Sequence, residues 1–222
     1  TQGVSSAASD VYKRQGHVMA SGTQPAAAAD HWQFGTTQVW RRAHRHGERG
    51  EPQARELLGK ALGLDPAQVP LLRDARGRPT LQPALPEWDT GWSHSGDHLL
   101  VGLGHGVRLG VDLERIRERP RLLDIAQRFF HPDEIAWLTA LPAETQQPLF
   151  FRLWCAKEAL LKAHGHGLSF GLHRLAFAPV ASGALQLHWC DPALGEATRW
   201  QLHEWLAAPD CRAALACYPL AV

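Results

Sequence analysis

Cysteine, methionine and long apolar runs are scarce in this chain of 222 residues, and each shortage excludes a class of protein. The four cysteines are scattered without a C-x-x-C pair, which excludes a disulfide-rich scaffold and predicts reduced thiols in a cytoplasmic protein. No apolar run approaches the roughly 20 residues that a membrane-spanning helix needs. The net charge is only +1, so no overall field favours nucleic acid or a membrane as a partner.

Histidine is plentiful, but the thirteen histidines do not form a recognisable set of metal ligands. The close pairs are His44 with His46 and His164 with His166. Both are flanked by glycine or arginine, as surface loops are. We therefore expect loops there rather than metal sites.

Methionine occurs once, at position 19, and the segment before it has no apolar periodicity. We expect native translation to begin at Met19 and residues 1–18 to be an arm that adds nothing to the fold. The alanine-rich stretch after Met19 is expected to be a loose arm as well.

Helical spacing of apolar residues dominates two parts of the chain. From Val39 to Leu64 the pattern is helical but broken by "HGERGEP", and a helix begins after Pro52. Past Pro120, three more helices are predicted from "RLLDIAQRFF", "HPDEIAWLTAL" and "ETQQPLFFRLWCAKEALLKAHGHG". The last of them is stopped by Gly165.

Strand patterns fill most of the remainder. A polar turn that carries Ser93 and His94 leads into the strand "LLVGLG", and "VRLGVDLERI" follows as a second strand after a turn around Gly106. Four further strand-like segments lie beyond the longest helix. Helices and strands are segregated along the chain, which predicts the α+β class. Residues 19–106 and 107–222 are expected to be two halves, each with a helix on a few strands.

Asp112 and Glu114 lie two residues apart on a predicted strand, so their side chains point to the same face. Two carboxylates on one face suit a hard cation such as Mg²⁺, which takes oxygen ligands. The alternative is a solvated strand face, and the pair by itself favours that alternative. Glu158 supplies a third ligand if its helix packs across the strand, which spacing alone does not decide.

A second set of residues suits phosphate groups. Ser93 and His94 offer a hydroxyl, an imidazole and backbone N–H groups to an anion. Arg78 and Arg55 can pair with further phosphates. The alternatives are an ordinary turn and surface arginines, the commoner case for each arginine singly. Because Mg²⁺ is usually held by carboxylates plus substrate phosphates, the two sets together indicate phosphoryl or phosphodiester chemistry.

The stretch "FRLWCAKEALLKAHGHGL" places Glu158 and Lys162 one helical turn apart. Charges at that spacing are usually a surface ion pair on an amphipathic helix. The spacing leaves open whether this pair is such an ion bridge or half of an active site.

Four segments resemble the 4'-phosphopantetheinyl transferases in order and spacing: "WSHSGDHLLVGLG", "LGVDLERI", "RFFHPDE" and "FFRLWCAKEALLKAHGHGLS". The resemblance is to the larger, pseudo-dimeric class that activates peptide and polyketide synthases, and it covers Arg55 to Phe177. The motifs G-[IV]-D-[IL]-E and W-x-x-K-E-x-x-x-K carry it together. The resemblance implies two similar α+β halves related by a pseudo-twofold axis, with coenzyme A bound in the cleft between them.

The resemblance also implies roles for individual residues. Asp112, Glu114 and Glu158 match ligands of Mg²⁺, which Mn²⁺ can replace. Glu158 also matches a candidate general base, and Lys162 matches a contact to the pyrophosphate. The residues that match coenzyme A contacts are Ser93, His94, Arg78, Arg55 and Lys162. In this chain Arg78 replaces a lysine, and Glu56 stands where relatives often carry a small hydroxyl residue near the 3'-phosphate.

The implied reaction moves 4'-phosphopantetheine from coenzyme A to a serine of an apo acyl or peptidyl carrier protein and releases 3',5'-ADP, a step of secondary-metabolite biosynthesis. We expect a monomeric cytoplasmic transferase that binds neither nucleic acid nor membrane. Two alternatives stay open: a Mg²⁺-dependent pyrophosphatase or nucleotide hydrolase with water as nucleophile, and a non-catalytic homologue that binds a carrier protein or coenzyme A. The sequence does not identify the carrier.

Overall fold

The computed structural model describes residues 30–45 and 47–220, so the predicted arm at 1–18, Met19 and His46 lie outside the described residues. The elements of the first half are β1 (His31–Phe34), β2 (Thr37–Ala43), α2 (Glu51–Leu62), β3 (Leu72–Arg73), β4 (Pro79–Thr80), β5 (Trp88–Ser95) and β6 (His98–His105). Those of the second half are β7 (Val107–Arg115), α3 (Leu122–Phe129), α4 (Pro132–Ala140), α5 (Ala143–His164), β8 (Leu175–Pro179), β9 (Leu185–Cys190), β10 (Gln201–Ala208) and β11 (Cys211–Pro219).

The two halves repeat one strand arrangement. In the first half, β2 pairs antiparallel with β6, which pairs antiparallel with β5. In the second half, β7 pairs with β11 and β11 with β10 in the same sense. The main helix and a short hairpin, β3–β4 or β8–β9, lie between the first and last of these strands in both halves. The predicted α+β class and the predicted repeat are confirmed. The boundary at 106–107 falls in the turn between β6 and β7, and the division into domains stays a prediction.

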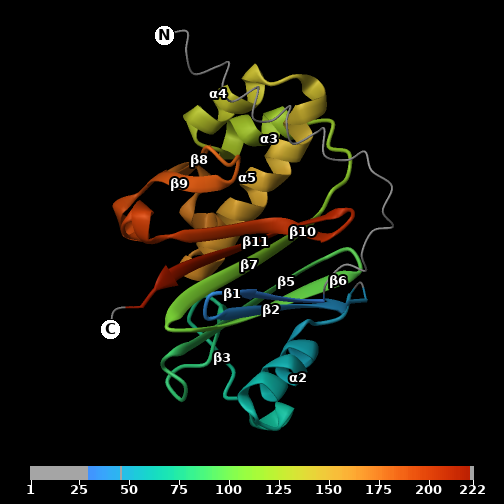
Figure 1. Ribbon diagram of the computed structural model, residues 1–222, viewed down its shortest axis with the longest axis vertical. Coiled ribbons are helices and arrows are strands. Elements are labelled where there is room, and N and C mark those ends of the chain that lie inside the picture. The colour runs from blue at the N-terminus through green and yellow to red at the C-terminus, as the bar shows by residue number, and fades with distance from the viewer. Residues whose placement is uncertain (1–29, 46, 221–222) are drawn as a thin grey trace.

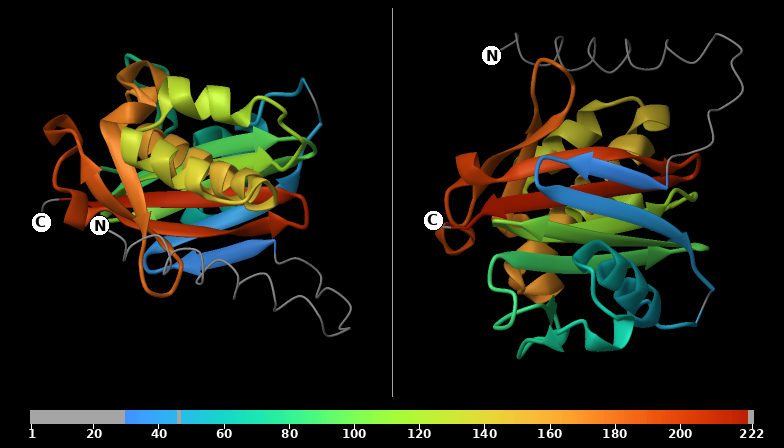
Figure 2. Two further views of the ribbon diagram at one scale, coloured as in Figure 1. Left: turned by 90° about the horizontal axis from the view of Figure 1, so that it is seen from above. Right: turned by 60° about the horizontal axis from the view of Figure 1, so that its bottom comes forward.

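The chain is layered, with the two sheets in the middle and helices outside them (Figure 1). The apolar face of α2, with Leu57 and Leu58, packs on Leu99 and Val101 of β6. Between the sheets, Leu100 of β6 belongs to a core that the second sheet completes. Because strand residues alternate between faces, neighbouring leucines of β6 serve two different cores. The view from below in Figure 2 shows α2 lying across the first sheet.

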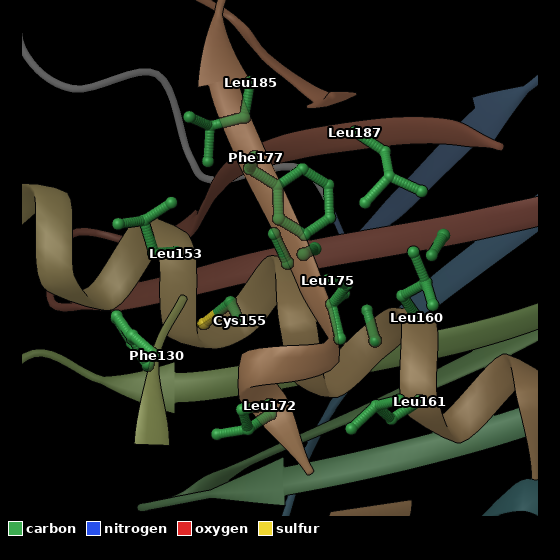
Figure 3. Packing of buried hydrophobic residues seen from close by; sticks show 14 of the residues in the cluster. Phe130, Leu153, Cys155, Leu160, Leu161, Leu172, Leu175, Phe177, Leu185 and Leu187 are labelled. Carbon is green, nitrogen blue, oxygen red and sulfur yellow. The ribbon is translucent and has the colours of Figure 1, made fainter. Parts of the chain in front are cut away.

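The largest core surrounds α5. Leu153 and Leu160 of this helix pack with Phe177 and Leu187 of the β8–β9 hairpin (Figure 3). Cys155 lies on the side towards β11, where its thiol donates to the carbonyl oxygen of Arg212. All of these side chains are buried, and burial of such side chains is the main source of a domain's stability. The helix is therefore held in place on one side by the β8–β9 hairpin.

On its other side, α5 lies directly against β7 because Gly110 has no side chain. A Cβ atom at this position would lie 2.1 Å from the carbonyl oxygen of Ala159 and 2.4 Å from the backbone nitrogen of Ala163. Neither distance is sterically possible, so only glycine permits this approach. The contact brings Glu158 and Lys162, the neighbours of these two alanines, alongside β7.

Most predicted elements are confirmed, including the helix after Pro52 and the end of α5 at Gly165, which has a left-handed φ of 87°. Two predictions are wrong. The helical pattern from Val39 begins in strand β2, whose residues alternate between buried and partly exposed. Ser93 and His94 lie near the end of β5, and the turn follows them. Strand β1 was not predicted. Among the described residues, no helix combines the length and apolarity needed to cross a bilayer.

Candidate active site

Three predicted residues meet where β5, β7 and α5 come together. The Nζ atom of Lys162 lies 2.6 Å from Oδ1 of Asp112 and donates a hydrogen bond of 2.9 Å to Oγ of Ser93. Ser93 in turn donates to the same Asp112 oxygen at 3.1 Å. Asp112 is only 3% exposed. The strand-to-helix contact that sequence spacing left open therefore exists.

The second oxygen of Asp112 is left unsatisfied. Its Oδ2 atom is buried and accepts no hydrogen bond from a nitrogen or oxygen donor within the described part of the chain. The neighbouring group is the thiol of Cys155, a weak donor whose own pKa is raised mainly by burial and then by the charge of Asp112. Buried polar atoms without a partner are rare in folded proteins because the lost hydration costs free energy. An unsatisfied carboxylate oxygen is a ligand suited to a hard cation.

Glu158 lies one turn before Lys162 on α5 and is 8% exposed. Burial, followed by the negative charge of Asp112, raises the pKa of Glu158 from 4.5 to about 7, although the charge of Lys162 opposes this. The site thus holds more negative charge than the single ammonium group balances. This surplus is the condition that a divalent cation would relieve.

Glu114 lies on the same face of β7, partly exposed, and accepts a hydrogen bond of 3.1 Å from the indole nitrogen of Trp154. Burial and then the charge of Asp112 raise the pKa of this carboxyl group. For Lys162, burial opposes the charged form, but the charge of Asp112, the hydrogen bond to Asp112 and the charge of Glu158 together outweigh burial and raise the pKa of the lysine. Lys162 is therefore an ammonium ion at neutral pH.

The three acids do not yet converge on one point. Among the described residues, the group of three potential ligands whose donor atoms lie within 4.8 Å of one another is His98, Asp210 and Cys211, near the β5–β6 and β10–β11 turns. Asp112, Glu114 and Glu158 are not such a group, and Lys162 contacts the Asp112 oxygen instead. Side-chain movement is needed before all three could bind one cation.

A cavity of about 270 Å³ opens beside Lys162, between the two halves. The lining residues are Arg76, Gly77, Arg78, Pro79, Thr90, Gly91, Trp92, Leu109, Gly110, Val111, Lys162, Gly165, His166 and Gly167. They come from the β3–β4 hairpin, from β5 and β7, and from the end of α5 and the loop after it. The position fits the expected cleft between the halves.

The predicted basic residues behave differently from one another. Arg78 lines the cavity, but its guanidinium is bound to Asp89 and to backbone carbonyl groups. Arg55 lies on α2, where it pairs with Glu51 at 3.2 Å and donates to the carbonyl oxygens of Val69 and Leu71. The structure thus brings Ser93 and Lys162 to the acids, but it does not bring Arg55 there.

His94 points away from Ser93 on β5 and lies against His44, with ring centroids 4.7 Å apart and ring planes tilted by 30°. The Nδ1 atom of His44 lies 3.3 Å from the side-chain oxygen of Gln53, and its buried Nε2 atom makes no hydrogen bond in the described part of the chain. A second pocket, lined in part by His44, Arg45 and Gln53, adjoins this ring. Sequence analysis identified neither Gln53 nor the pairing of His44 with His94.

Comparison with known proteins places these features in a family. A sequence model of the 4'-phosphopantetheinyl transferase superfamily matches residues 108–217, the part that contains both acids of β7 and all of α5. The chain belongs to this superfamily. It is 35% identical over 165 residues to the 4'-phosphopantetheinyl transferase HetI of Nostoc sp., covering 73% of this chain and 66% of the relative.

A second member of the superfamily, the 4'-phosphopantetheinyl transferase Sfp of Bacillus subtilis, is 30% identical over 139 residues, which cover 63% of this chain and 57% of that protein. The matches thus span between about half and two thirds of these relatives. Among solved structures, holo-ACP-synthase from Plasmodium yoelii matches 53% of this chain and 98% of its own at 15% identity, with a TM-score of 0.39.

Proposed function

We propose that this phosphopantetheinyl transferase superfamily member moves 4'-phosphopantetheine from coenzyme A to a serine of an apo acyl or peptidyl carrier protein and releases 3',5'-ADP. One observation carries the proposal. A buried carboxylate with an unsatisfied oxygen, Asp112, lies between a second buried acid, Glu158, and a charged lysine, Lys162, beside a cavity between the halves. Lys162 lines this cavity and contacts Asp112, so a cation and oxygen ligands lie together beside it.

Asp112, Glu114 and Glu158 would hold Mg²⁺, or Mn²⁺ in its place. The unsatisfied Oδ2 atom of Asp112 and the surplus of negative charge fit a hard divalent cation, because carboxylate oxygens are its preferred ligands. Such an ion, when bound, offsets charge on the pyrophosphate as its bond breaks. To hold the ion jointly, the three carboxylates would have to move closer together, and Lys162 would have to give up its contact with Asp112.

Lys162 then contacts the pyrophosphate of coenzyme A. Its side chain lines the cavity and is 35% exposed, while its ammonium group is anchored to Ser93 and Asp112. A fixed positive charge aimed at the leaving group stabilises the transition state more than the ground state. Ser93 would hold an oxygen of the pyrophosphate beside Lys162. His94, on the other face of β5, would contact the phosphate that the pocket beside His44 and Arg45 takes, which we assign to the 3'-phosphate.

Glu158 would remove the proton from the attacking serine hydroxyl, directly or through one water. Its carboxylate lies on the same face of α5 as Lys162, one turn away, so base and phosphate contact flank one reacting centre. A base held within hydrogen-bond reach of the nucleophile typically accelerates such a reaction by 10²–10⁴-fold.

We also propose that one chain suffices and that it works in the cytoplasm. The cavity is lined by residues from both halves of a single chain, so a second copy is not needed to complete it. All four cysteines are free thiols, as a reducing compartment maintains them. Which carrier protein is modified is not determined by any of these features.

The test is incubation of the protein with an apo carrier protein, coenzyme A and Mg²⁺, followed by the intact mass of the carrier. The proposal predicts a mass increase of one phosphopantetheine per carrier and an equal release of 3',5'-ADP. Release of phosphate or nucleotide without any carrier would instead indicate a hydrolase. Binding of coenzyme A or carrier without a mass increase would indicate a non-catalytic homologue.

A further inference from the structure

The guanidinium of Arg78 is fully occupied by the protein itself. An arginine side chain has five N–H donors. In this chain Nε donates to the carbonyl oxygen of Lys162 at 3.0 Å, and Nη1 donates to the carbonyl oxygen of Pro79 at 3.1 Å and to Oδ1 of Asp89 at 3.0 Å. The Nη2 atom donates to Oδ2 of Asp89 and to the carbonyl oxygen of Leu109, the latter at 2.9 Å. No donor is left for a phosphate.

These bonds join four separate parts of the fold. Asp89 lies on β5, Leu109 on β7 and Lys162 on α5, while Arg78 itself precedes β4. Asp89 also accepts a hydrogen bond of 2.8 Å from the backbone nitrogen of Leu109. Since β5 and β7 belong to different sheets, this arginine and aspartate provide a polar link between the two halves beside the cavity.

The bond to Lys162 has a particular consequence for α5. The last four carbonyl groups of a helix lack partners within the helix, and Lys162 lies in the final turn. The guanidinium of Arg78 satisfies one of these carbonyl groups and places a positive charge at the negative end of the helix dipole. It thereby fixes the turn from which the Lys162 side chain extends to Asp112.

We propose that Arg78 and Asp89 are positioning residues, which hold the last turn of α5 against β7 so that Lys162 and Glu158 face Asp112. Arg78 does not itself contact coenzyme A. The predicted phosphate contact would require breaking a pair whose side chains are only 15% and 10% exposed. Breaking a buried pair is costly because it leaves an uncompensated charge.

Arg76, on the same loop, provides the contrast. It lines the same cavity and is exposed, and within the described residues its guanidinium makes no hydrogen bond or ion pair. If an arginine of this loop meets a phosphate, the geometry favours Arg76. The variant Arg76→Ala is therefore the control: it removes an arginine from the cavity but leaves the link between Arg78 and Asp89 intact.

The kinetic test rests on the proposed function and compares Asp89→Asn, Arg78→Lys, their combination and Arg76→Ala. Asp89→Asn is decisive, because a carboxylate has no reason to bind a phosphate. We expect it to lower kcat by about 10-fold or more with little change in KM for coenzyme A, since a misplaced catalytic group costs rate. Arg78→Lys should behave alike, and the double variant should be no worse than the worse single one, because the pair acts as a unit. Arg76→Ala should change only KM.

A second readout needs no activity. Hydrogen exchange of the backbone amides in the last turn of α5, from Leu161 to Gly165, should accelerate in Asp89→Asn and Arg78→Lys but not in Arg76→Ala. This holds even if the protein modifies no carrier, so failure of the proposed function is distinguishable from failure of the positioning role. Unchanged exchange and unchanged kcat in a folded Asp89→Asn variant would overturn the proposal. So would an Arg78→Lys variant that raises KM for coenzyme A alone.

Discussion

Lys157 and Glu158 are consecutive residues of α5, yet their surroundings are opposite. Lys157 lies 2.6 Å from Glu134 in an ion pair whose side chains are both 0% exposed. The lysine also donates to the carbonyl oxygens of Leu172 and Leu175. Glu134 accepts hydrogen bonds from the backbone nitrogens of Phe177, at 2.9 Å, and His131, at 3.2 Å.

Glu158 faces the other side of the helix, where Asp112 keeps an unsatisfied oxygen and negative charge is in surplus. Burial pushes the pKa of Glu134 up and the pKa of Lys157 down, but each partner's charge opposes the shift. At Glu158 the charge of Lys162 also opposes the shift in pKa, but the negative charges of Asp112 and Glu114 add to the effect of burial. The ion pair of Lys157 and Glu134, whose polar atoms have hydrogen-bond partners, supports the fold. The cluster of Asp112 and Glu158, which has an unpaired oxygen and surplus negative charge, is suited to a ligand.

The largest effect on the fold is expected from Lys157→Met. It leaves Glu134 buried without its partner, which typically costs about 3–5 kcal/mol and lowers Tm by on the order of 10 °C in a chain of this size. Thermal unfolding followed by circular dichroism measures this. The double variant Lys157→Met with Glu134→Gln should recover part of the loss, because no buried charge remains unpaired. If Lys157→Met alone is as stable as the original protein, the ion pair between Lys157 and Glu134 does not support the fold.

Asp112→Ala should reduce carrier modification to background while the fold persists. The change removes the carboxylate that contacts Ser93 and Lys162 and that would bind Mg²⁺, but it removes no residue of an apolar core. Intact-mass analysis of the carrier measures transfer, and the thermal melt serves as the control. Turnover like that of the original protein at low millimolar Mg²⁺ would contradict the metal assignment.

A smaller effect is expected from Ser93→Ala. The hydroxyl group orients Lys162 and is placed to hold a phosphate of coenzyme A, so its loss should raise KM for coenzyme A several-fold and lower kcat less. Initial rates at varied coenzyme A and fixed carrier separate the two constants. If KM rises for the carrier and not for coenzyme A, Ser93 faces the protein substrate.

Removal of residues 1–18 is expected to change neither Tm nor transfer rate. This stretch has no apolar periodicity and therefore offers no face to bury. A loss of several degrees in Tm would show that residues 1–18 contribute to the stability of the fold, contrary to this expectation.

The sequence predicted the elements whose signal is local. The spacing of apolar residues and the stop at Gly165 were enough for α5, and alternation was enough for β7. The resemblance then matched Asp112 and Glu158, already candidates from the sequence pattern, to metal ligands. Contacts between distant segments gave no local signal: Gly110 reads as an ordinary strand glycine until α5 is seen against it. The partners of Arg78 lie at positions 79, 89, 109 and 162, so sequence inspection could only match it to a phosphate contact.

At strand β2 the local sequence pattern was present but misleading, because it predicted a helix. Its seven residues "TQVWRRA" include arginines at its partly exposed end, and they merge with a polar loop that precedes a true helix. Pairing with β6 along its whole length decides the conformation. Such pairing is a long-range contact that overrides local propensity.

The variant Glu158→Gln tests most directly whether the face of α5 that carries Glu158 and Lys162 is part of an active site. Transfer should fall by at least ~10²-fold, since the amide can neither accept the proton nor bind Mg²⁺ well. Without metal, ionised Glu158 costs stability as pH rises from 4.5 through about 7. The variant should therefore be more stable at pH 8, by on the order of 2–3 kcal/mol, and match the original protein below pH 4.5. A variant that transfers at the original rate and melts lower at pH 8 would show that Glu158 is an ordinary stabilising charge.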